Sequence, residues 1–230
     1  MKKLVVYFIL LLILVFSSPH SGNAQELYQK VYPDFGIGAS VGFSYFFPGD
    51  LNDYIDLTVP GALNGAKKEH INTGINVGLF LMYNPLPFLE IVPEFDYFYS
   101  RRAFSQIDLD AVASYIQLGA TCYYIRELYP GINLRFGAGI SDYIGTVSWE
   151  YPYSDSQKWE GSSIGFHGAV GGEMILSEEM TLSLILVSRY ANIGELKDRD
   201  NNIIRFPGKN KNLNMNFSGI EAKVKLGYYF

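Results

Sequence analysis

Hydrophobic and polar residues alternate with a period of two along most of the chain. In residues 35–47, apolar side chains occupy one set of alternate positions, and glycine or serine occupies the other. The same alternation recurs in residues 71–83, in residues 132–144 and at the end of the chain. Successive side chains of a strand point to opposite faces of its sheet, so a period of two predicts β-strands. We expect eight strands, at residues 35–47, 71–83, 88–100, 111–125, 132–144, 163–176, 181–193 and 213–230.

The less apolar face of these strands indicates what surrounds them. A soluble barrel keeps its bulky apolar side chains inside and presents charges to water. Here the second face carries Gly, Ser and Asn with isolated charges, which is too small and sparse for a surface in water. Small residues suit the narrow lumen of a closed barrel whose apolar face is turned to lipid. The pattern predicts an all-β fold: an eight-stranded antiparallel up-and-down transmembrane β-barrel over residues 35–230.

The expected connections alternate between long and short. Long links cover residues 48–70, 101–110, 145–162 and 194–212, and short links cover residues 84–87, 126–131 and 177–180. Long external loops and short periplasmic turns are typical of outer-membrane barrels. Aromatic residues gather near the strand ends, where interfacial girdles belong. Pro93 falls inside the third strand and removes a hydrogen-bond donor, so we expect a β-bulge there.

The beginning of the chain has the pattern of a secretory signal. Lys2 and Lys3 precede an apolar run from Leu4 to Phe16, which is too short for a spanning helix, and small residues lead to Ala24. We expect a cleavable signal peptide at residues 1–24, a short periplasmic segment at residues 25–34, and export of the rest. No later stretch is apolar enough to predict a membrane helix.

Composition narrows the classes of function. The 230 residues are 48% hydrophobic, 16% aromatic and 18% charged, a balance that excludes a disordered chain. Without Lys2 and Lys3, 16 of the 18 basic residues remain against 23 acidic ones, a net charge of −7 that argues against a nucleic-acid partner. Cys122 is alone, which excludes a disulfide framework, and its alternation with Leu118 and Ala120 places it on the lipid-facing side.

Both ends of the mature chain resemble a known family. The last eight residues, KVKLGYYF, resemble the assembly signal of bacterial outer-membrane proteins: Lys223, Tyr228 and Phe230 match it, and Lys225 stands where the pattern prefers Gly. The opening GIGASVGFSYFFPGD, residues 36–50, resembles the start of outer membrane protein beta-barrel domain proteins, a group with PorT-like members.

Over residues 35–230 the chain resembles the small eight-stranded barrels of the OmpA, OmpX and OmpW type. The resemblance implies location in the bacterial cell outer membrane as a monomer. It also implies insertion by the barrel assembly machinery and contact with outer-membrane lipid and lipopolysaccharide. The family is functionally mixed, so the resemblance implies no particular task.

Nine charged side chains fall on lumen-facing positions by parity. Buried charges are tolerated when they are paired, and an eight-stranded lumen is filled by side chains. We therefore expect a salt-bridged network that plugs the lumen, with a gate or proton-coupled pore as the alternative. The nine residues are Glu90, Glu94, Asp96, Arg135, Glu173, Arg189, Glu221, Lys223 and Lys225.

The heights of these residues on their strands predict which of them pair. Arg135 and Glu173 lie at similar height on neighbouring strands, and so do Arg189 and Glu221. The two acids of the third strand face the two lysines of the last strand across the ring. The expected cross-lumen set is Glu94, Asp96, Lys223 and Lys225.

Other motifs give no catalytic, cofactor or metal site. The glycines Gly36, Gly38 and Gly42 lie on one strand face with no helix after them, which fits packing and not a dinucleotide loop. Acidic runs at residues 50–56 and 198–202 resemble calcium loops only in part, because Ile203 and Lys209 replace the Gly and Glu that the second would need. His167 points inward, and Ala169 stands where a barrel lipid A deacylase would need Ser.

The long loops carry what is exposed. The fourth has a net charge of +2 and either binds lipopolysaccharide phosphates or is an ordinary solvated loop. The third holds Trp149 and Trp159, which either form an exposed contact surface or dip into the upper interface. The basic residues of the fourth loop are Lys197, Arg199, Arg205, Lys209 and Lys211.

The leading hypothesis is a non-enzymatic outer-membrane barrel with a plugged lumen, which contributes to envelope integrity or surface contact through its loops. The first alternative is an OmpW-like conduit for small apolar solutes. The second is a lipid-modifying barrel enzyme.

Overall fold

The computed structural model describes residues 34–58, 70–104, 109–150, 157–208 and 210–230. The expected signal peptide and the periplasmic segment as far as residue 33 lie outside them, and both stay predictions. No helix within the described residues is long and apolar enough to cross a membrane.

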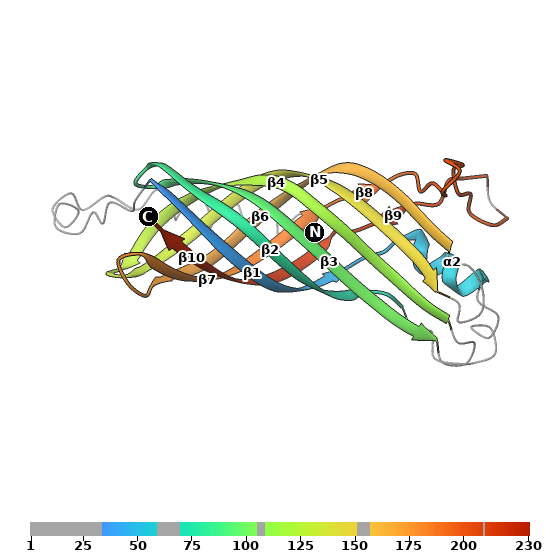
Figure 1. The fold of residues 1–230 in the computed structure, drawn as a ribbon, viewed down its shortest axis with the longest axis horizontal. Coiled ribbons are helices and arrows are strands. Elements are labelled where there is room, and N and C mark those ends of the chain that lie inside the picture. Colours follow the sequence, from blue (N-terminus) through green and yellow to red (C-terminus); the bar gives the residue numbers. More distant parts are fainter. Residues whose placement is uncertain (1–33, 59–69, 105–108, 151–156, 209) are drawn as a thin grey trace, which may run out of the picture. The chain divides into compact units, whose positions relative to one another are not determined.

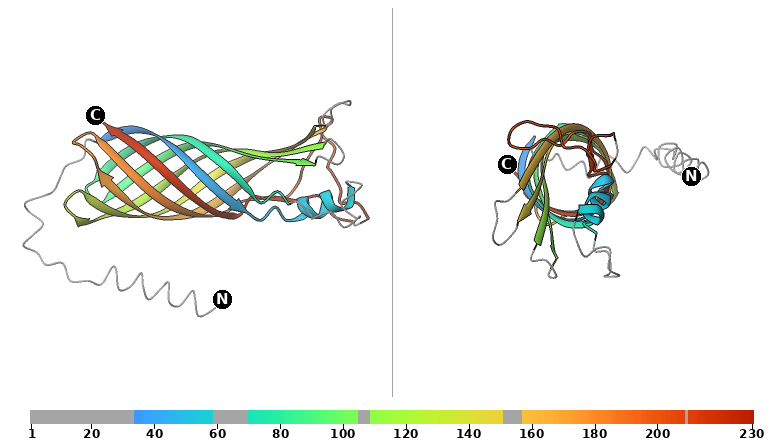
Figure 2. Two further views of the ribbon diagram at one scale, coloured as in Figure 1. Left: turned by 90° about the horizontal axis from the view of Figure 1, so that it is seen from below. Right: turned by 90° about the vertical axis from the view of Figure 1, so that its right-hand side faces the viewer.

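Antiparallel strands close into a barrel in which each strand pairs with the next along the chain and β10 closes onto β1 (Figures 1 and 2). The predicted eight-stranded up-and-down barrel is confirmed. Its strands are β1 Phe35–Phe46, β2 Thr73–Leu86, β3 Leu89–Phe104, β4 Leu109–Tyr129, β5 Ile132–Glu150, β6 Gln157–Ile175, β7 Met180–Tyr190 and β10 Gly219–Tyr229.

The outside of this wall is apolar. Val41 and Val77 pair across β1 and β2, and their side chains are 53% and 49% exposed, whereas Ser40 and Asn76 beside them are buried in the lumen. A closed barrel satisfies its own backbone, and an apolar exterior is stable only in lipid. The predicted parity of the strands is confirmed, and the wall is a transmembrane one.

Aromatic side chains mark the two edges of the apolar band. Tyr45, Tyr97 and Tyr99 are exposed on the outside toward the end with the long links, which we call the long-loop end. Phe35 and Tyr83 are exposed toward the opposite, short-turn end, where their rings stack with centroids 5.0 Å apart. Interfacial girdles at these two levels are typical of membrane barrels.

Two of the expected long links are mostly strand. β3 continues to Phe104 and β4 begins at Leu109, while β5 continues to Glu150 and β6 begins at Gln157. In these extensions the inward side chains, such as those of Val147 and Trp149, are buried. The outward positions carry polar residues such as Ser162, which is exposed. These two links were predicted wrongly. The strands stay paired above the membrane, but their outward residues there are polar, so the alternation that identified the strands is lost.

The turns at the short-turn end are tight. Gly131 turns β4 into β5 with a φ of 83°, a conformation that residues with a Cβ rarely adopt. The bulge expected at Pro93 is absent: the pairing of β3 with β4 runs through Pro93 without a shift, and the register with β2 is the same at Glu94 and at Ile91. The register shift between β2 and β3 falls instead between Tyr83 and Leu86, beside the turn.

A helix that the sequence pattern did not predict lies at the long-loop end. The helix α2, Asp50–Thr58, follows β1 at this end (Figure 2). Its Leu51 and Ile55 belong to a buried apolar cluster. Its Tyr54 ring lies with its centroid 6.1 Å from that of Trp149 and 5.2 Å from that of Trp159. Both tryptophans are buried, 3% and 5% exposed, so the expected exposed or interfacial position for them is wrong.

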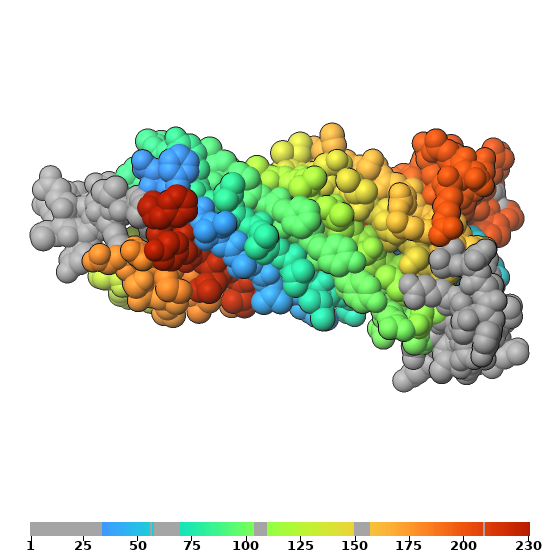
Figure 3. Space-filling view, in the orientation of Figure 1, coloured from blue at the N-terminus to red at the C-terminus, as the bar shows by residue number. Residues whose placement is uncertain are grey.

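The chain after β7 covers the same end of the barrel. The expected strands at residues 181–193 and 213–230 are interrupted: β8, Asn192–Ile193, and β9, Met215–Asn216, form a separate two-stranded sheet. The segment between them folds against β6, since Lys197 pairs with both Glu160 and Ile203. Figure 3 shows this segment, in orange-red, at the yellow ends of β5 and β6.

Candidate functional site in the barrel lumen

All nine charged residues expected in the lumen are buried there. They come from β3, β5, β6, β7 and β10, so the strands bring together residues far apart in the sequence. The ion pairs divide into two clusters, which we name the Arg135 cluster and the Lys223 cluster.

The Arg135 cluster lies near the short-turn end. Arg135 Nη1 donates to Glu173 Oε2 at 2.8 Å, which is the predicted pair, and the same guanidinium forms an ion pair with Glu90. Tyr229 Oη donates to Glu90 Oε1 at 2.8 Å, and Asn133 Nδ2 donates to Glu173 Oε1 at 3.1 Å. One arginine therefore holds two carboxylates, and each carboxylate has a further neutral donor.

The Lys223 cluster spans the ring above it. Lys223 Nζ lies 2.7 Å from Asp96 Oδ2 and 3.6 Å from Glu94 Oε2, and Lys225 Nζ donates to Glu94 Oε1 at 2.9 Å. On the β7 and β10 side, Arg189 Nη1 donates to Glu221 Oε2 at 2.9 Å. Glu221 Oε1 in turn lies 3.7 Å from Lys223 Nζ. The predicted pairs across the ring and between β7 and β10 are both present.

Aromatic rings link the clusters. The Tyr123 ring centroid lies 4.5 Å from Arg135 Cζ and 5.5 Å from Lys225 Nζ, so one ring faces a cation of each cluster. Arg189 Cζ lies 4.9 Å from the Tyr115 centroid. A cation over an aromatic face is favoured by the ring quadrupole, more so away from water.

The glycines of the inner face make room for these charges. A Cβ on Gly78 would collide with the Asp96 carboxylate and would lie 2.8 Å from Ser40 Oγ. The alternation of glycine with apolar residues therefore has two causes, lipid outside and a crowded ion-pair network inside.

Apolar layers close the lumen on both sides of the charges. Toward the short-turn end, Met82, Ile125 and Tyr229 belong to one buried cluster. Toward the long-loop end, Phe98 stacks on Tyr115 with centroids 4.7 Å apart, within the cluster that α2 covers. The network thus lies between two packed layers of side chains.

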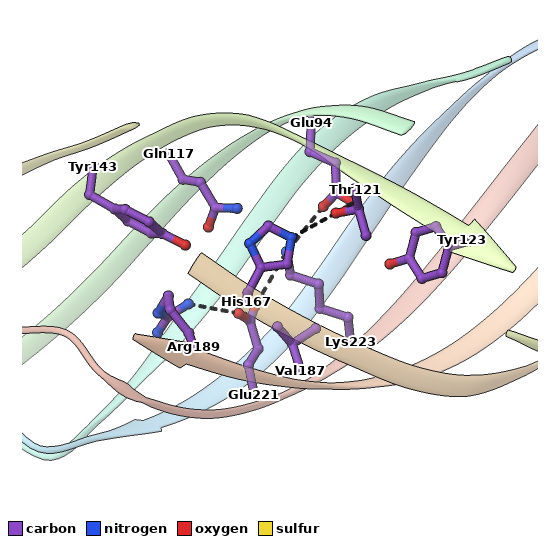
Figure 4. A pocket seen from close by; sticks show the side chains of 10 residues that line it. All are labelled: Glu94, Gln117, Thr121, Tyr123, Tyr143, His167, Val187, Arg189, Glu221 and Lys223. Carbon is purple, nitrogen blue, oxygen red and sulfur yellow. Dashed lines mark hydrogen bonds and ion pairs between the residues drawn. The ribbon is translucent and has the colours of Figure 1, made fainter. Parts of the chain in front are cut away.

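Two lumen residues, Thr121 and His167, were missed as members of the network, and Gln117 forms a separate neutral pair with Ser141. Thr121 Oγ1 donates to Glu94 Oε1 at 3.0 Å and lies 2.7 Å from His167 Nε2, and Gln117 Nε2 donates to Ser141 Oγ at 3.1 Å (Figure 4). Strand parity gave the inward direction of these side chains. Their partners depend on register between strands, which the sequence pattern did not supply.

The expected lipopolysaccharide-contact residues lie on the segment between β8 and β9. Lys197, Arg199 and Arg205 are exposed, and Lys211 forms an ion pair with Asp50 of α2 at 2.6 Å. Lys209 lies outside the described residues.

The two acidic runs have structural partners. Asn52 of α2 accepts a hydrogen bond from the Ile71 amide and donates to Asn72. Asp198 Oδ1 accepts hydrogen bonds from the amides of Asp200 and Asn202, and the hydrogen bonds from Asn202 hold the pKa of Asp198 below its usual value. Among the described residues, no group of three or more His, Cys, Asp or Glu side chains could hold a metal ion.

The residues of the expected assembly signal divide between the two faces of β10. Lys223 belongs to the lumen network, whereas Tyr228 and Phe230 are exposed on the outside. Cys122 is exposed on the outer face of β4, as its parity predicted.

Comparison with known proteins identifies the architecture. No family model matches the sequence, and no curated protein matches it. Neisserial surface protein A has a similar structure, with a TM-score of 0.53 at 14% identity over 86% of this chain and 97% of that one. The fold is that of the small outer-membrane β-barrels. OprG from Pseudomonas aeruginosa has a TM-score of 0.50 at 13% identity, over 86% of this chain and 96% of that one. A major outer membrane protein from Thermus thermophilus has a TM-score of 0.50 at 10% identity, over 85% of this chain and 99% of that one. The location expected from the sequence, the bacterial outer membrane, agrees with this fold.

Proposed function

We propose that this outer-membrane barrel has a closed lumen and contributes to envelope integrity or surface contact through its long-loop end, as a monomer. The observation that supports a closed lumen is its filling at three levels: an apolar layer, the paired charges, and the apolar cluster under α2. A lumen filled by packed side chains and paired charges offers ions no open aqueous path. A small apolar solute that crossed the lumen would have to pass the level of the paired charges, which disfavours a conduit for such solutes.

Planar bilayer recording tests this proposal. The wild-type barrel should show no steady conductance of the size of an open pore. The variant Glu94→Gln with Asp96→Asn, which leaves Lys223 and Lys225 without their acids, should show brief openings. A large, steady wild-type conductance would overturn the closed lumen and favour a conduit.

We also propose that the role is not enzymatic. The supporting observation is the position of His167, which lies inside the lumen with its Nε2 beside Thr121, away from the lipid-facing wall where an acyl chain would react. Mass spectrometry of lipid A from a deletion strain should match the parent strain. A lost or gained acyl chain, restored by the intact gene and not by a His167→Asn copy, would overturn this.

A second role rests on the segment between β8 and β9. Lys197, Arg199 and Arg205 are exposed, and none of them forms an ion pair within the described part of the chain. Basic side chains just above an anionic leaflet are attracted by about 1 kcal/mol each. We propose that they contact lipopolysaccharide phosphates.

Unfolding in vesicles with and without lipopolysaccharide tests this contact. Lipopolysaccharide should raise the urea midpoint of the wild type, and the triple variant Lys197→Gln, Arg199→Gln, Arg205→Gln should lose that increase. The control is Lys158→Gln, because Lys158 already pairs with Glu160 at 2.5 Å. An equal increase in wild type and triple variant would contradict the proposal.

A further inference from the structure

A small cavity lies in the lumen between His167 and the Lys223 cluster. Its lining includes side chains from β6, β7 and β10, namely His167, Arg189 and Glu221, together with Tyr143 of β5 (Figure 4). It is lined by both polar and apolar atoms, and Val187 supplies an apolar side. A polar cavity of this kind holds a molecule only if its walls offer the right donors and acceptors.

The hydrogen bonds of Thr121 determine which nitrogen of His167 faces the cavity as an acceptor. Thr121 has a single hydroxyl proton, and the Glu94 carboxylate, which can only accept, takes it at 3.0 Å. The Thr121 oxygen must then accept from His167 Nε2 at 2.7 Å. In the neutral ring Nδ1 is therefore unprotonated and needs a donor. Figure 4 shows this nitrogen on the side of Tyr143.

Four buried side-chain atoms of the lining residues lack a hydrogen-bond partner within the described part of the chain. They are two acceptors, His167 Nδ1 and Glu221 Oε1, one donor, Arg189 Nη2, and the Tyr143 hydroxyl, which can donate and accept. Glu221 Oε1 has only the long 3.7 Å approach of Lys223 Nζ. A buried polar atom without a partner destabilises the fold, so four around one cavity call for a common partner.

We propose that the cavity binds a single water molecule. The water donates to His167 Nδ1 and Glu221 Oε1 and accepts from Arg189 Nη2, and the Tyr143 hydroxyl is placed to supply the fourth contact. An anion would need donors on every side, yet His167 Nδ1 and Glu221 Oε1 are acceptors. A metal cation would need acceptors throughout, yet Arg189 offers a proton. Water both donates and accepts, and it is small enough for this cavity.

This water connects the two parts of the Lys223 cluster. On one side of the water, hydrogen bonds link His167 to Thr121 and Thr121 to Glu94. On its other side lie Arg189 of β7 and Glu221 of β10, which are bonded to each other. The hydrogen-bonded chain then runs from one wall of the barrel to the opposite one. The site does not depend on the proposed function, because a conducting barrel could hold the same water.

A crystal structure of the intact barrel at a resolution that shows waters is the direct test. A water peak within hydrogen-bond distance of His167 Nδ1 and Arg189 Nη2 is expected, and bromide-soaked crystals should show no anomalous peak there. Nitrogen-15 spectra of labelled histidine, assigned with His70→Gln, should show Nδ1 of His167 unprotonated and hydrogen-bonded. A bromide peak, a protonated Nδ1 or a cavity without density would overturn the proposal.

A cavity-filling pair of variants gives an independent measurement. Val187→Leu should displace the water, and oxygen-17 relaxation should count one long-lived water fewer than in wild type. Val92→Leu is the control, because Val92 is buried in the same apolar cluster as Val187 but does not line the cavity. An unchanged count in Val187→Leu would show that no water occupies the cavity.

Discussion

Neighbouring residues of one strand meet opposite surroundings in this barrel. Val77 lies against lipid, while Gly78 next to it gives way to the Asp96 carboxylate. The valine is replaceable by any residue that lipid accepts, whereas the glycine has no substitute that leaves the ion pair in place. The residue type at each position is thus restricted either by lipid on the outer face or by packing in the lumen. The two restrictions alternate along the strand.

An arginine on the lipid face should be costly. Val41→Arg places a charge in the middle of the apolar band, where it costs about 2–4 kcal/mol of folding stability. Urea unfolding in lipid vesicles measures the loss. Ser162→Arg is the control, because Ser162 is exposed on the outward face of β6 beside Glu160, at the polar extension of the wall, and it should change stability little. Equal stabilities of Val41→Arg and wild type would show that the parity of β1 is wrong.

Acid should loosen the turn at Asp198. Its pKa is lower in the folded protein than in an unfolded chain because Asn202 donates to the carboxylate, so the stabilisation is present above the usual Asp pKa. It is lost as the pH falls through the lowered value. Hydrogen exchange of the Asp200 and Asn202 amides, corrected for intrinsic rates, should accelerate in that acid range. In Asp198→Ala exchange should be fast at neutral pH, and a pH-independent protection in wild type would contradict the assignment.

The sequence pattern predicted the barrel strands but not the cap, by which we mean α2 together with the segment from β8 to β9 at the long-loop end. The alternation of apolar with small or polar residues located all the barrel strands, because each strand has one face in lipid and one in the lumen. Above the membrane that constraint ends, so the extensions of β3 to β6 were expected to be loops. The helix α2 has only nine residues, and its Leu51 and Ile55 are buried in one cluster with Trp149 and Trp159, far along the chain. Such contacts leave no periodic signal.

The sequence predicted the inward direction of the charged lumen side chains and three of their pairings. The pairings are Arg135 with Glu173, Arg189 with Glu221, and the two acids of β3 with the two lysines of β10. Parity pointed every charge inward, and equal height suggested Arg135 with Glu173. It did not suggest Glu90 as a second partner of Arg135, nor the neutral donors Tyr229 and Thr121. Those contacts depend on the stagger between strands, which is set when the ring closes.

The cap should loosen without the barrel. Leu51→Ala removes a buried side chain from the cluster under α2, and truncations of this kind cost about 2–5 kcal/mol. The loss should fall on α2, whose amides should exchange faster, while amides of β1 and β10 keep their protection. Leu57→Ala is the matched control, since Leu57 is exposed on the same helix. Faster exchange throughout the barrel would show that the cap and the wall unfold together.

Removing one side of the Lys223 cluster should cost more than removing both. Glu94→Gln with Asp96→Asn leaves Lys225 without a carboxylate and Lys223 with only Glu221 at 3.7 Å. Breaking one side of a buried pair costs about 3–5 kcal/mol. The urea midpoint should therefore fall. Adding Lys223→Met and Lys225→Met should recover part of the loss, because apolar replacements of both sides are nearly neutral. Additive, independent effects of the acidic and basic substitutions would show that the four side chains do not interact.

Closure of the ring makes the whole molecule resist partial unfolding. The last strand, β10, pairs with both β1 and β7 along its length, so no strand can leave without exposing backbone groups on two neighbours at once. In detergent or lipid each unsatisfied group costs several kcal/mol. The ion-pair clusters tie the walls across the lumen as well.

The mature protein should therefore be heat-modifiable. An unboiled sample in dodecyl sulfate should keep its compact barrel and migrate differently from a boiled one, with a β-type circular dichroism spectrum before heating. The variant that lacks the acids of the Lys223 cluster should convert at a lower temperature than wild type, because its lumen is destabilised while its backbone ring is intact. The variant with both acids and lysines replaced should convert closer to wild type. Identical migration of boiled and unboiled wild type would contradict a closed barrel, and identical conversion temperatures of all three would place the resistance in the backbone ring alone.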